Sequence, residues 1–436
     1  MRCLWISRYI PYPLDEGAKV YSARLAESLA GAGAFVRYLG FGDVSCAAAE
    51  HRVEWVAVPG EKRRRVAALF SSLPVAAAID ATAAYSALLE QQLREGWDAI
   101  ILDGYGTGWA LRRCRQNAAE HGSRAPVLLH VSHNHEEALW RSMAHHGSGL
   151  LPKRLALWLN YRKVRSLERK VVRGVDLITA ITEEDAAALA QPQSRTLTLT
   201  PGHTGWIAPP RVISAATPRR VIIVGSFRWL MKQENLARFL EIVDPVFRDN
   251  GIALDVVGDV PDELLATLRL RCQATHFHGF VDDIAPYLGQ SRIAVVPELI
   301  GGGFKLKFLD YIFARVPVAT LSQAAAGLSP QLRQQMICSD DLRALVAGIV
   351  GSIDDIDMLN SMQQRAFDAG QALFRWEDRG QQLRHAIARL RHERQAASDT
   401  ARQASKEFGV STIQFDYGTE ATAVEEAERV VELRSR

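Results

Sequence analysis

Short runs of β-branched and other apolar residues alternate along the chain with longer stretches of helical periodicity. In the first half the apolar runs are CLWIS, VEWVAV, DAIILDG, PVLLHVS and DLITAIT. In the second half they are RVIIVGS, ALDVVGD, THFHGF, RIAVVPE, VPVATL and QMICSDD. This alternation predicts strands that take turns with helices. We therefore expect an α/β fold in which helices cover both faces of parallel sheets.

A turn-rich stretch divides this pattern into two halves. TPGHTGWIAPPRVISAATPRR at 200–220 has no clear periodicity and is typical of a connection between domains. Two α/β units, over 1–205 and 206–375, therefore fit the pattern better than one large sheet. A helix is predicted over 376–395, and the polar, alanine-rich segment 396–436 is expected to be a helical or disordered tail.

Composition narrows the class of protein. A chain of 436 residues with 48% apolar residues can bury a large core, and its length favours two or three domains. The net charge of +3 gives no overall signal for a polyanion, so no nucleic acid partner is expected. The five cysteines include no CxxC pair, which indicates reduced thiols in the cytosol. The N-terminal apolar run is too short for a signal peptide, and no stretch approaches the roughly 20 apolar residues of a membrane span.

The stretch GGGFKLKFLDYIFARV at 301–316 places glycines and lysines directly ahead of a helix-like pattern. RIAVVP is predicted to be a buried strand, GGGF the loop at its carboxyl end, and KLKFLDYIFARV a helix. Ligands bind at such loops in open parallel sheets, where glycines allow close approach and helix N-termini attract anions. Lys305 and Lys307 add positive charge, and Asp310 stands where a carboxylate can accept hydrogen bonds from a ribose. A diphosphate site and a turn before a solvated helix face fit these residues equally well.

Six segments along the chain are ISRYIPYPLDEGAKVYSARLAESLAGAG, SHNHEEALWRSM, VDLITAITEEDAAAL, VIIVGSFRW, FHGFVDDIAPYLGQSRIAVVPELIGGGFKLKFLDYIFARVPVAT and FRWEDRGQQL. In these segments and their order, the chain resembles the retaining family 4 glycosyltransferases of the glycosyltransferase B fold over roughly residues 1–390. The resemblance implies two Rossmann-like domains across a cleft, with the acceptor on the first and a nucleotide-sugar on the second. It also implies that the helix over 376–395 crosses back, and that no metal or other cofactor is needed.

In this family the donor is held by the glycine loop and the helix that follows it. The resemblance assigns donor binding there to Gly302, Gly303, Phe304, Lys305, Lys307 and Asp310. Many members carry two glutamates that flank seven residues, and here Gly302 and Asp310 occupy those positions. The glutamate that touches the sugar hydroxyls is therefore missing, the ribose-binding acid is shortened, and the identity of the sugar stays open.

Two further donor contacts follow from the resemblance. Arg228 and Lys232, in GSFRWLMK, lie where the family has basic residues that hold the pyrophosphate, although solvated loop residues are the alternative. Gly17, in DEGAKV, resembles a glycine loop that meets the donor phosphates. A plain tight turn is the competing interpretation of that glycine.

The segment HVSHNHEE at 130–137 combines three histidines with two acids. A metal site is the weaker interpretation, because the cluster stands at the end of one strand and no second cluster has metal-ligand spacing. The resemblance instead aligns His133, Asn134 and Glu136 with a catalytic motif in which the histidine faces the donor sugar. The family is thought to attack the sugar on the face of the leaving diphosphate, which helps to deprotonate the acceptor. His133 then orients the sugar and stabilises positive charge at the anomeric carbon.

The expected function is retaining transfer of a sugar from a UDP- or GDP-sugar to a saccharide or lipid-linked acceptor, in polysaccharide or glycoconjugate synthesis. Two alternatives remain open. A catalytically silent member would bind a sugar nucleotide or a partner protein without reaction, and a sugar-nucleotide epimerase would convert the donor without an acceptor.

Residues 151–174 are predicted to form a basic amphipathic helix, with eight lysines and arginines against one acid. Its apolar stripe consists of Leu157, Tyr161, Val164, Leu167 and Val171. Another face carries Arg162, Arg165, Arg169 and Arg173. A solvated helix packed on the first domain is the simpler interpretation. The alternative is a cytoplasmic protein that lies on an anionic inner membrane surface through this helix and EKRRRVAALF at 61–70.

Overall fold

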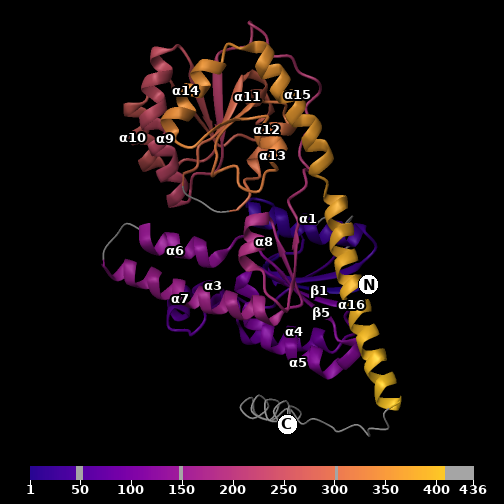
Figure 1. The fold of residues 1–436 in the computed structure, drawn as a ribbon. Helices are drawn as coiled ribbons and strands as arrows, with labels where there is room; N and C mark the ends of the chain where they lie inside the picture. Colours follow the sequence, from indigo (N-terminus) through magenta and orange to yellow (C-terminus); the bar gives the residue numbers. More distant parts are fainter. Residues whose placement is uncertain (46–52, 147–150, 300–302, 408–436) are drawn as a thin grey trace, which may run out of the picture. The chain divides into compact units, whose positions relative to one another are not determined.

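The computed structural model describes residues 1–45, 53–146, 151–299 and 303–407 (Figure 1). Met1–Leu390 form one compact unit, and Arg391–Arg436 form a second. The first unit contains two separate parallel β-sheets, each with helices packed against it. The expected α/β fold with two parallel-sheet domains is therefore confirmed. Beyond position 407, the predicted tail lies outside the described residues.

The first sheet has seven strands in the order β3-β2-β1-β4-β5-β6-β7. The strands are β1 (Arg2–Tyr9), β2 (Phe35–Phe41), β3 (Val53–Ala57), β4 (Ala99–Asp103), β5 (Val127–Val131), β6 (Leu177–Ala180) and β7 (Arg195–Thr198). Every residue of β4 and β5 is buried, as expected for strands covered on both faces. In β1, Leu4 and Ile6 join one apolar cluster, whereas Cys3 and Trp5 join another, because side chains alternate between the faces.

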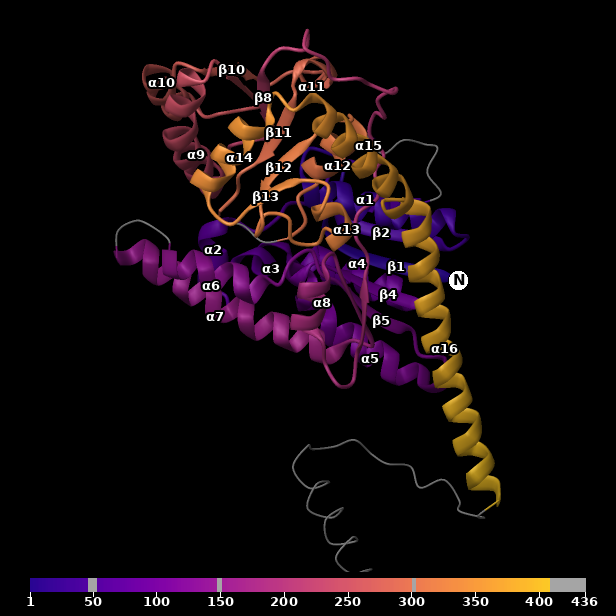
Figure 2. The ribbon, with the colours of Figure 1, turned by 45° about the horizontal axis from the view of Figure 1, so that its top comes forward.

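Helices and short turns of helix connect these strands. They are α1 (Gly17–Gly31), α2 (Arg65–Leu69), α3 (Val75–Asp80), α4 (Ala83–Leu93), η1 (Tyr105–Ala110), α5 (Leu111–His121), η2 (Gly122–Arg124), α6 (Glu136–His146), α7 (Leu151–Gly174) and α8 (Glu183–Leu189). Helices α6 and α7 lie side by side (Figures 1 and 2). The predicted apolar stripe of α7 packs inward, with Val164 and Val171 fully buried. Packing of this helix on the first domain is thus confirmed.

The second sheet has six strands in the order β10-β9-β8-β11-β12-β13. The strands are β8 (Arg220–Val224), β9 (Ala253–Val257), β10 (Thr275–Gly279), β11 (Ile293–Val296), β12 (Val318–Leu321) and β13 (Ile337–Ser339). The helices are α9 (Leu230–Asp249), α10 (Asp262–Arg271), α11 (Ala285–Gln290), α12 (Lys307–Phe313), α13 (Pro330–Arg333), α14 (Leu342–Ser352) and α15 (Ile356–Leu373). As predicted, β11 is completely buried and α12 follows the glycine loop.

Both sheets have a point at which the strand order reverses. In the first sheet it lies between β1 and β4, and in the second between β8 and β11. Loops diverge there at the carboxyl ends of the strands, and this is where open α/β sheets bind ligands. The functional residues are therefore sought at these two positions.

A last helix, α16 (Trp376–Glu407), begins after α15 and returns to the first sheet. Its residues Leu383 and Ile387 are fully buried in the apolar cluster that contains Trp5. A Cβ at Gly380 would stand 2.0 Å from the carbonyl oxygen of Ser28, so only glycine allows the two helices to approach this closely. Among the described residues, no helix is both long enough and apolar enough to cross a membrane.

Candidate functional site

The reversal point of the first sheet places a histidine beside a buried acid. His133 follows β5, and its Nε2 lies 2.6 Å from Oδ1 of Asp103, the last residue of β4. Oδ2 of Asp103 also accepts hydrogen bonds from the Trp5 indole at 3.0 Å and the Tyr38 hydroxyl at 3.2 Å. Burial acts to raise the pKa of Asp103, but His133 and the other donors outweigh it and lower the pKa. An ionised carboxylate therefore fixes the orientation of the His133 ring.

The second ring nitrogen of His133 has no partner of its own. Nδ1 is buried and makes no hydrogen bond within the described part of the chain. A buried polar atom without a partner is costly, and it is often satisfied by a bound ligand or water. Ser22 lies near the other nitrogen, with its Oγ 3.5 Å from Nε2.

Asn134 and Glu136 complete the predicted catalytic motif in the same segment. The Asn134 amide donates to the Glu136 carboxylate at 3.3 Å, and the Ser132 hydroxyl holds the Asn134 carbonyl at 2.8 Å. Burial raises the pKa of Glu136, while Asn134 and His133 oppose this shift. His133, Asn134, Glu136 and Asp103 all line one cavity of about 730 Å³. The structure thus brings the three predicted residues together, and it adds Asp103.

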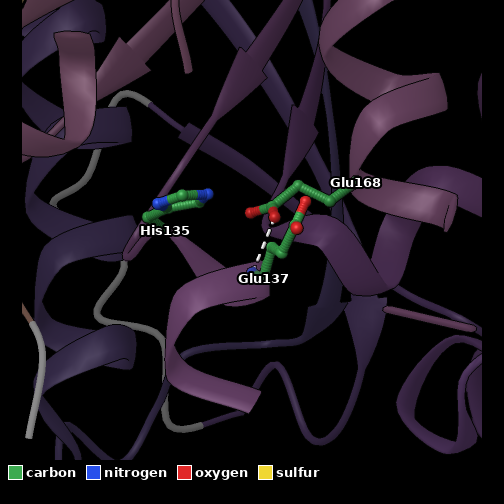
Figure 3. A group of neighbouring side chains, drawn as sticks. All are labelled: His135, Glu137 and Glu168. Atoms are coloured by element: carbon green, nitrogen blue, oxygen red, sulfur yellow. Dashed lines mark hydrogen bonds between the residues drawn. The ribbon is translucent and has the colours of Figure 1, made fainter. Parts of the chain in front are cut away.

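His135, Glu137 and Glu168 point toward one another beside this motif (Figure 3). Their possible ligand atoms lie within 4.8 Å of one another, which is the size of a metal site. However, Glu168 accepts the backbone N–H groups of Glu136 and Glu137 at 2.8 and 2.7 Å. The Glu137 carboxylate pairs with Arg141, Arg165 and Arg169.

These contacts give the group a structural role. Arginines next to Glu137 repel a cation, and the oxygens of Glu168 already cap the first turn of α6. Burial raises the pKa of Glu168 to about 7, opposed by the two backbone N–H groups. We therefore interpret the group as the anchor that joins α6 to α7 and holds the start of α6 next to His133.

The reversal point of the second sheet gathers lysines around a largely buried glutamate. The Lys307 ammonium group donates to Oε1 of Glu298 at 2.6 Å, and Lys305 donates to the Gly303 carbonyl at 3.0 Å. Burial acts to raise the pKa of Glu298, but Lys307 and Lys305 lower it overall. Burial, followed by the charge of Lys307, lowers the pKa of Lys232. Three predicted donor-binding lysines therefore lie close enough to affect one another.

Asp310 lies in the first turn of α12, one turn after Lys307. Burial raises the pKa of its carboxyl group to about 6, although Lys307 acts to lower it. Among the residues that the structure describes, none donates a hydrogen bond to this carboxylate. A half-buried acid with vacant acceptor oxygens beside lysines can receive hydroxyl groups of a ligand.

The predicted glycines lie beside these groups. Gly303 has a φ of 70°, and a Cβ there would stand 2.3 Å from Oδ1 of Asn134. Gly17 begins α1, and a Cβ there would lie 3.4 Å from Cδ1 of Leu306. Gly302 lies outside the described residues. The donor loop thus adjoins both the catalytic motif and the start of α1.

The two remaining predicted residues have other surroundings. Phe304 packs against Phe374, with ring centroids 5.8 Å apart. Arg228 is 78% exposed and pairs with Asp259. The donor contact of Arg228 therefore stays a prediction.

Sequence reasoning missed Asp103 and Glu298, which orient His133 and Lys307. Both have a recognisable position, because Asp103 ends a fully buried strand and Glu298 follows another. A carboxylate at such a strand end beside a reversal point is a signal for a site. The pairing of Asp103 with His133 is nevertheless hidden in the sequence, because the two residues lie far apart along the chain.

Comparison with known proteins agrees with this arrangement. A family model described as Glycosyl transferases group 1 matches residues 218–355. No curated protein sequence matches the chain significantly. Among solved structures, sucrose-phosphate synthase from Thermosynechococcus elongatus aligns with a TM-score of 0.64 and 19% identity, over 89% of this chain and 99% of that one.

Two other structures share the fold. Anabaena HepE in complex with UDP and glucose aligns with a TM-score of 0.57 and 15% identity, over 89% of this chain and 99% of that one. WaaG, a glycosyltransferase involved in lipopolysaccharide biosynthesis, aligns with a TM-score of 0.57 and 16% identity, over 88% of this chain and 99% of that one. Residues 218–355 thus match a group 1 glycosyltransferase domain, and the chain shares the two-domain glycosyltransferase B fold of these structures.

Proposed function

We propose that the protein is a retaining glycosyltransferase that uses a nucleoside diphosphate sugar. The observation that carries the proposal is the group of Lys232, Lys305 and Lys307 around the largely buried Glu298. With all three lysines protonated, three positive charges and one negative charge leave +2, which favours a dianionic diphosphate. The resident Glu298 keeps these lysines in place before the donor binds.

A UDP-sugar is the first candidate donor and a GDP-sugar the second. The similar HepE structure holds UDP and glucose, which supports uridine as the base. In the proposed complex, Lys305 and Lys307 bind the diphosphate and Asp310 accepts hydrogen bonds from the ribose. His133 meets the donor sugar from the first sheet, where the orphaned Nδ1 gains a partner.

The proposed mechanism does not require a general acid or a general base from the protein. The lysines stabilise the negative charge that develops on the leaving diphosphate, and this replaces the neutralisation that a metal supplies elsewhere. The departing phosphate takes the proton of the acceptor hydroxyl, which attacks the same face of the sugar. Asp103 holds the His133 ring where it can stabilise positive charge at the anomeric carbon.

A saccharide or lipid-linked acceptor remains part of the proposal, as does an anionic membrane surface at α7. Arg165 and Arg169 lie on the predicted basic face but pair with Glu137, so their charge is partly neutralised. The guanidinium carbon of Arg162 lies 5.0 Å from the centroid of the Trp158 ring, and the Arg162 side chain is exposed. Arg165 and Arg169 therefore contribute less to the attraction of α7 to anionic lipid than two unpaired arginines would.

The function is tested by incubating the protein with UDP- and GDP-sugars, with and without a mixture of saccharide and lipid-linked acceptors. Release of nucleoside diphosphate that rises on addition of an acceptor is the expected result. Tight nucleotide binding without any release would favour a silent binding protein. Conversion of the donor to an epimer, with no release, would favour an epimerase.

Asp310 gives a prediction that depends on pH. A carboxylate accepts ribose hydroxyls best when ionised, and the pKa of Asp310 is raised to about 6. UDP affinity should therefore increase as the pH rises through about 6. At pH 7.5 in calorimetry, we expect Asp310→Asn to bind UDP about tenfold more weakly than the wild type, because a charged acceptor is lost.

Asp310→Asn also controls for the change in protonation of UDP itself with pH. A phosphate group titrates at about pH 6 in both proteins, so the ratio of the two dissociation constants isolates Asp310. This ratio should shrink toward one at pH 5, where Asp310 is mostly protonated. A ratio that stays constant with pH would show that Asp310 does not contact the ribose as a carboxylate.

A further inference from the structure

We propose that the acceptor is an amphiphile whose apolar chain lies in the cavity beside His133 and whose reacting hydroxyl lies at the polar end. This inference rests on the proposed function and names its acceptor class. The cavity of about 730 Å³ has the size of a small-molecule site. Its polar end is made by Asp103, His133 and Glu136.

Most of the remaining wall of the cavity is apolar, although Glu16, Arg65, Ser142 and Glu234 also line it. Leu139, Trp140 and Met143 line it from α6, and Leu157 lines it from α7. A helix rises 1.5 Å per residue, so Met143 lies about 10 Å along α6 from Glu136. The cavity therefore extends from the catalytic motif along an apolar helix face.

The stretch of wall on α6 and α7 does not suit a saccharide, which needs a hydrogen-bond partner for most of its hydroxyls. Beyond Glu136, the lining residues of α6 and α7 offer a hydrogen-bonding side chain only at Trp140 and Ser142. Arg8 also lines the cavity, but its guanidinium group is bound to the buried Asp80 at 2.6 Å. Alkyl or isoprenoid groups fit such a surface, because their burial is favourable without polar partners.

The source of the chain is inferred from the outer faces of the same elements. Arg65 of α2 and Leu157 of α7 line the cavity, while Val66, Phe70 and Leu155 beside them are exposed. Phe70 is 88% exposed. The two elements are joined, since the Lys163 ammonium group donates to the carbonyls of Leu69 and Ser71 at 3.1 and 2.6 Å.

Exposed apolar residues also alternate there with basic ones, including Arg63, Arg64, Arg154 and Arg162. Apolar side chains among cations are suited to insertion at the surface of an anionic bilayer. A chain that enters from lipid is therefore a better fit than a soluble aromatic group. An aromatic acceptor becomes one of the outcomes of the test.

The chain-binding cavity is tested without catalysis. A fluorescent fatty acid, 11-(dansylamino)undecanoic acid, is titrated into the protein, and straight-chain alcohols of increasing length then displace it. Affinity should rise about fourfold for each methylene group that becomes buried. Leu157→Gln should weaken binding of the probe at least tenfold, whereas Leu159→Gln, on the exposed face of the same helix, should leave it unchanged. Circular dichroism melts confirm that both variants fold.

Absence of probe binding to the wild type, or equal loss in both variants, would overturn the inference. Stronger displacement by phenylethanol than by octanol would also overturn it, in favour of an aromatic acceptor. Binding of the probe persists if the protein transfers no sugar, so failure of the proposed function is recognised separately. Conversely, transfer to acceptors with and without an alkyl chain at equal rates would contradict the inference and leave the function standing.

Vesicles test the source of the chain. Vesicles of phosphatidylglycerol and phosphatidylcholine should sediment the wild-type protein at low salt, and pure phosphatidylcholine vesicles should sediment much less. Phe70→Ser should reduce sedimentation at least threefold while probe binding stays intact. Equal sedimentation of Phe70→Ser and wild type, or none of either, would contradict entry of the chain from lipid.

Discussion

Replacement of Lys307 by alanine is expected to weaken UDP binding by about ten- to a hundredfold. A charge-assisted hydrogen bond to a buried phosphate contributes about 1.5–3 kcal/mol, and Lys307 is the cation that Glu298 holds in place. The variant also leaves the Glu298 carboxylate beside the diphosphate without its counterion, which adds repulsion. Isothermal titration calorimetry with UDP measures the change.

Paired variants separate phosphate binding from folding. Removing one partner of a buried ion pair costs about 3–5 kcal/mol of stability. If Lys307→Ala has a lower melting temperature than the wild type, its loss of UDP binding could therefore reflect unfolding. The double variant Lys307→Met with Glu298→Gln removes both charges and should fold, yet bind UDP at least about tenfold more weakly. Glu298→Gln alone keeps the lysine and should bind UDP as well as the wild type or better. Wild-type affinity of the double variant would show that Lys307 does not hold the phosphate.

Replacement of His133 by alanine is expected to lower kcat by about a hundred- to a thousandfold, which is the usual effect of removing one preorganised electrostatic group. The dissociation constant of UDP should stay within about threefold, because the proposed contact is with the sugar and not with the phosphates. Steady-state kinetics and calorimetry on the same preparation give the two values. A comparable loss in both would indicate a structural histidine.

Asp103→Asn tests whether the buried carboxylate positions that ring. The amide keeps the shape of the side chain but loses the charge that fixes the donor at Nε2 of His133. We expect kcat to fall at least about tenfold, with no change in UDP affinity. His121→Ala, at the exposed end of α5, is the matched control and should behave as the wild type.

Much of the fold was predictable because buried parallel strands have a distinctive composition. All eleven predicted apolar runs coincide with strands, whereas β2 and β7 were missed. In β2, Arg37 interrupts the apolar run, and its charge is satisfied by Glu54 and Glu95 outside the strand. In β7, four residues at a sheet edge are mostly half exposed, so they lack the apolar signal.

The site was less predictable, because its geometry depends on pairs from different strands. The histidine motif and the glycine loop with its lysines were recognisable as local patterns. The acid that orients His133 lies 30 residues before it, and only the adjacency of β4 and β5 brings them together. The pairing of Arg165 and Arg169 with Glu137 depends on how α6 packs on α7, which periodicity does not reveal.

The stereochemistry of transfer tests the central claim most directly. An α-linked UDP-sugar is mixed with the protein and the acceptor that supports release of UDP, and proton NMR follows the anomeric signals from the first turnovers. The proposed same-face attack predicts that the new glycoside appears with the α configuration while UDP accumulates in equal amount. A product formed with the β configuration would contradict the account.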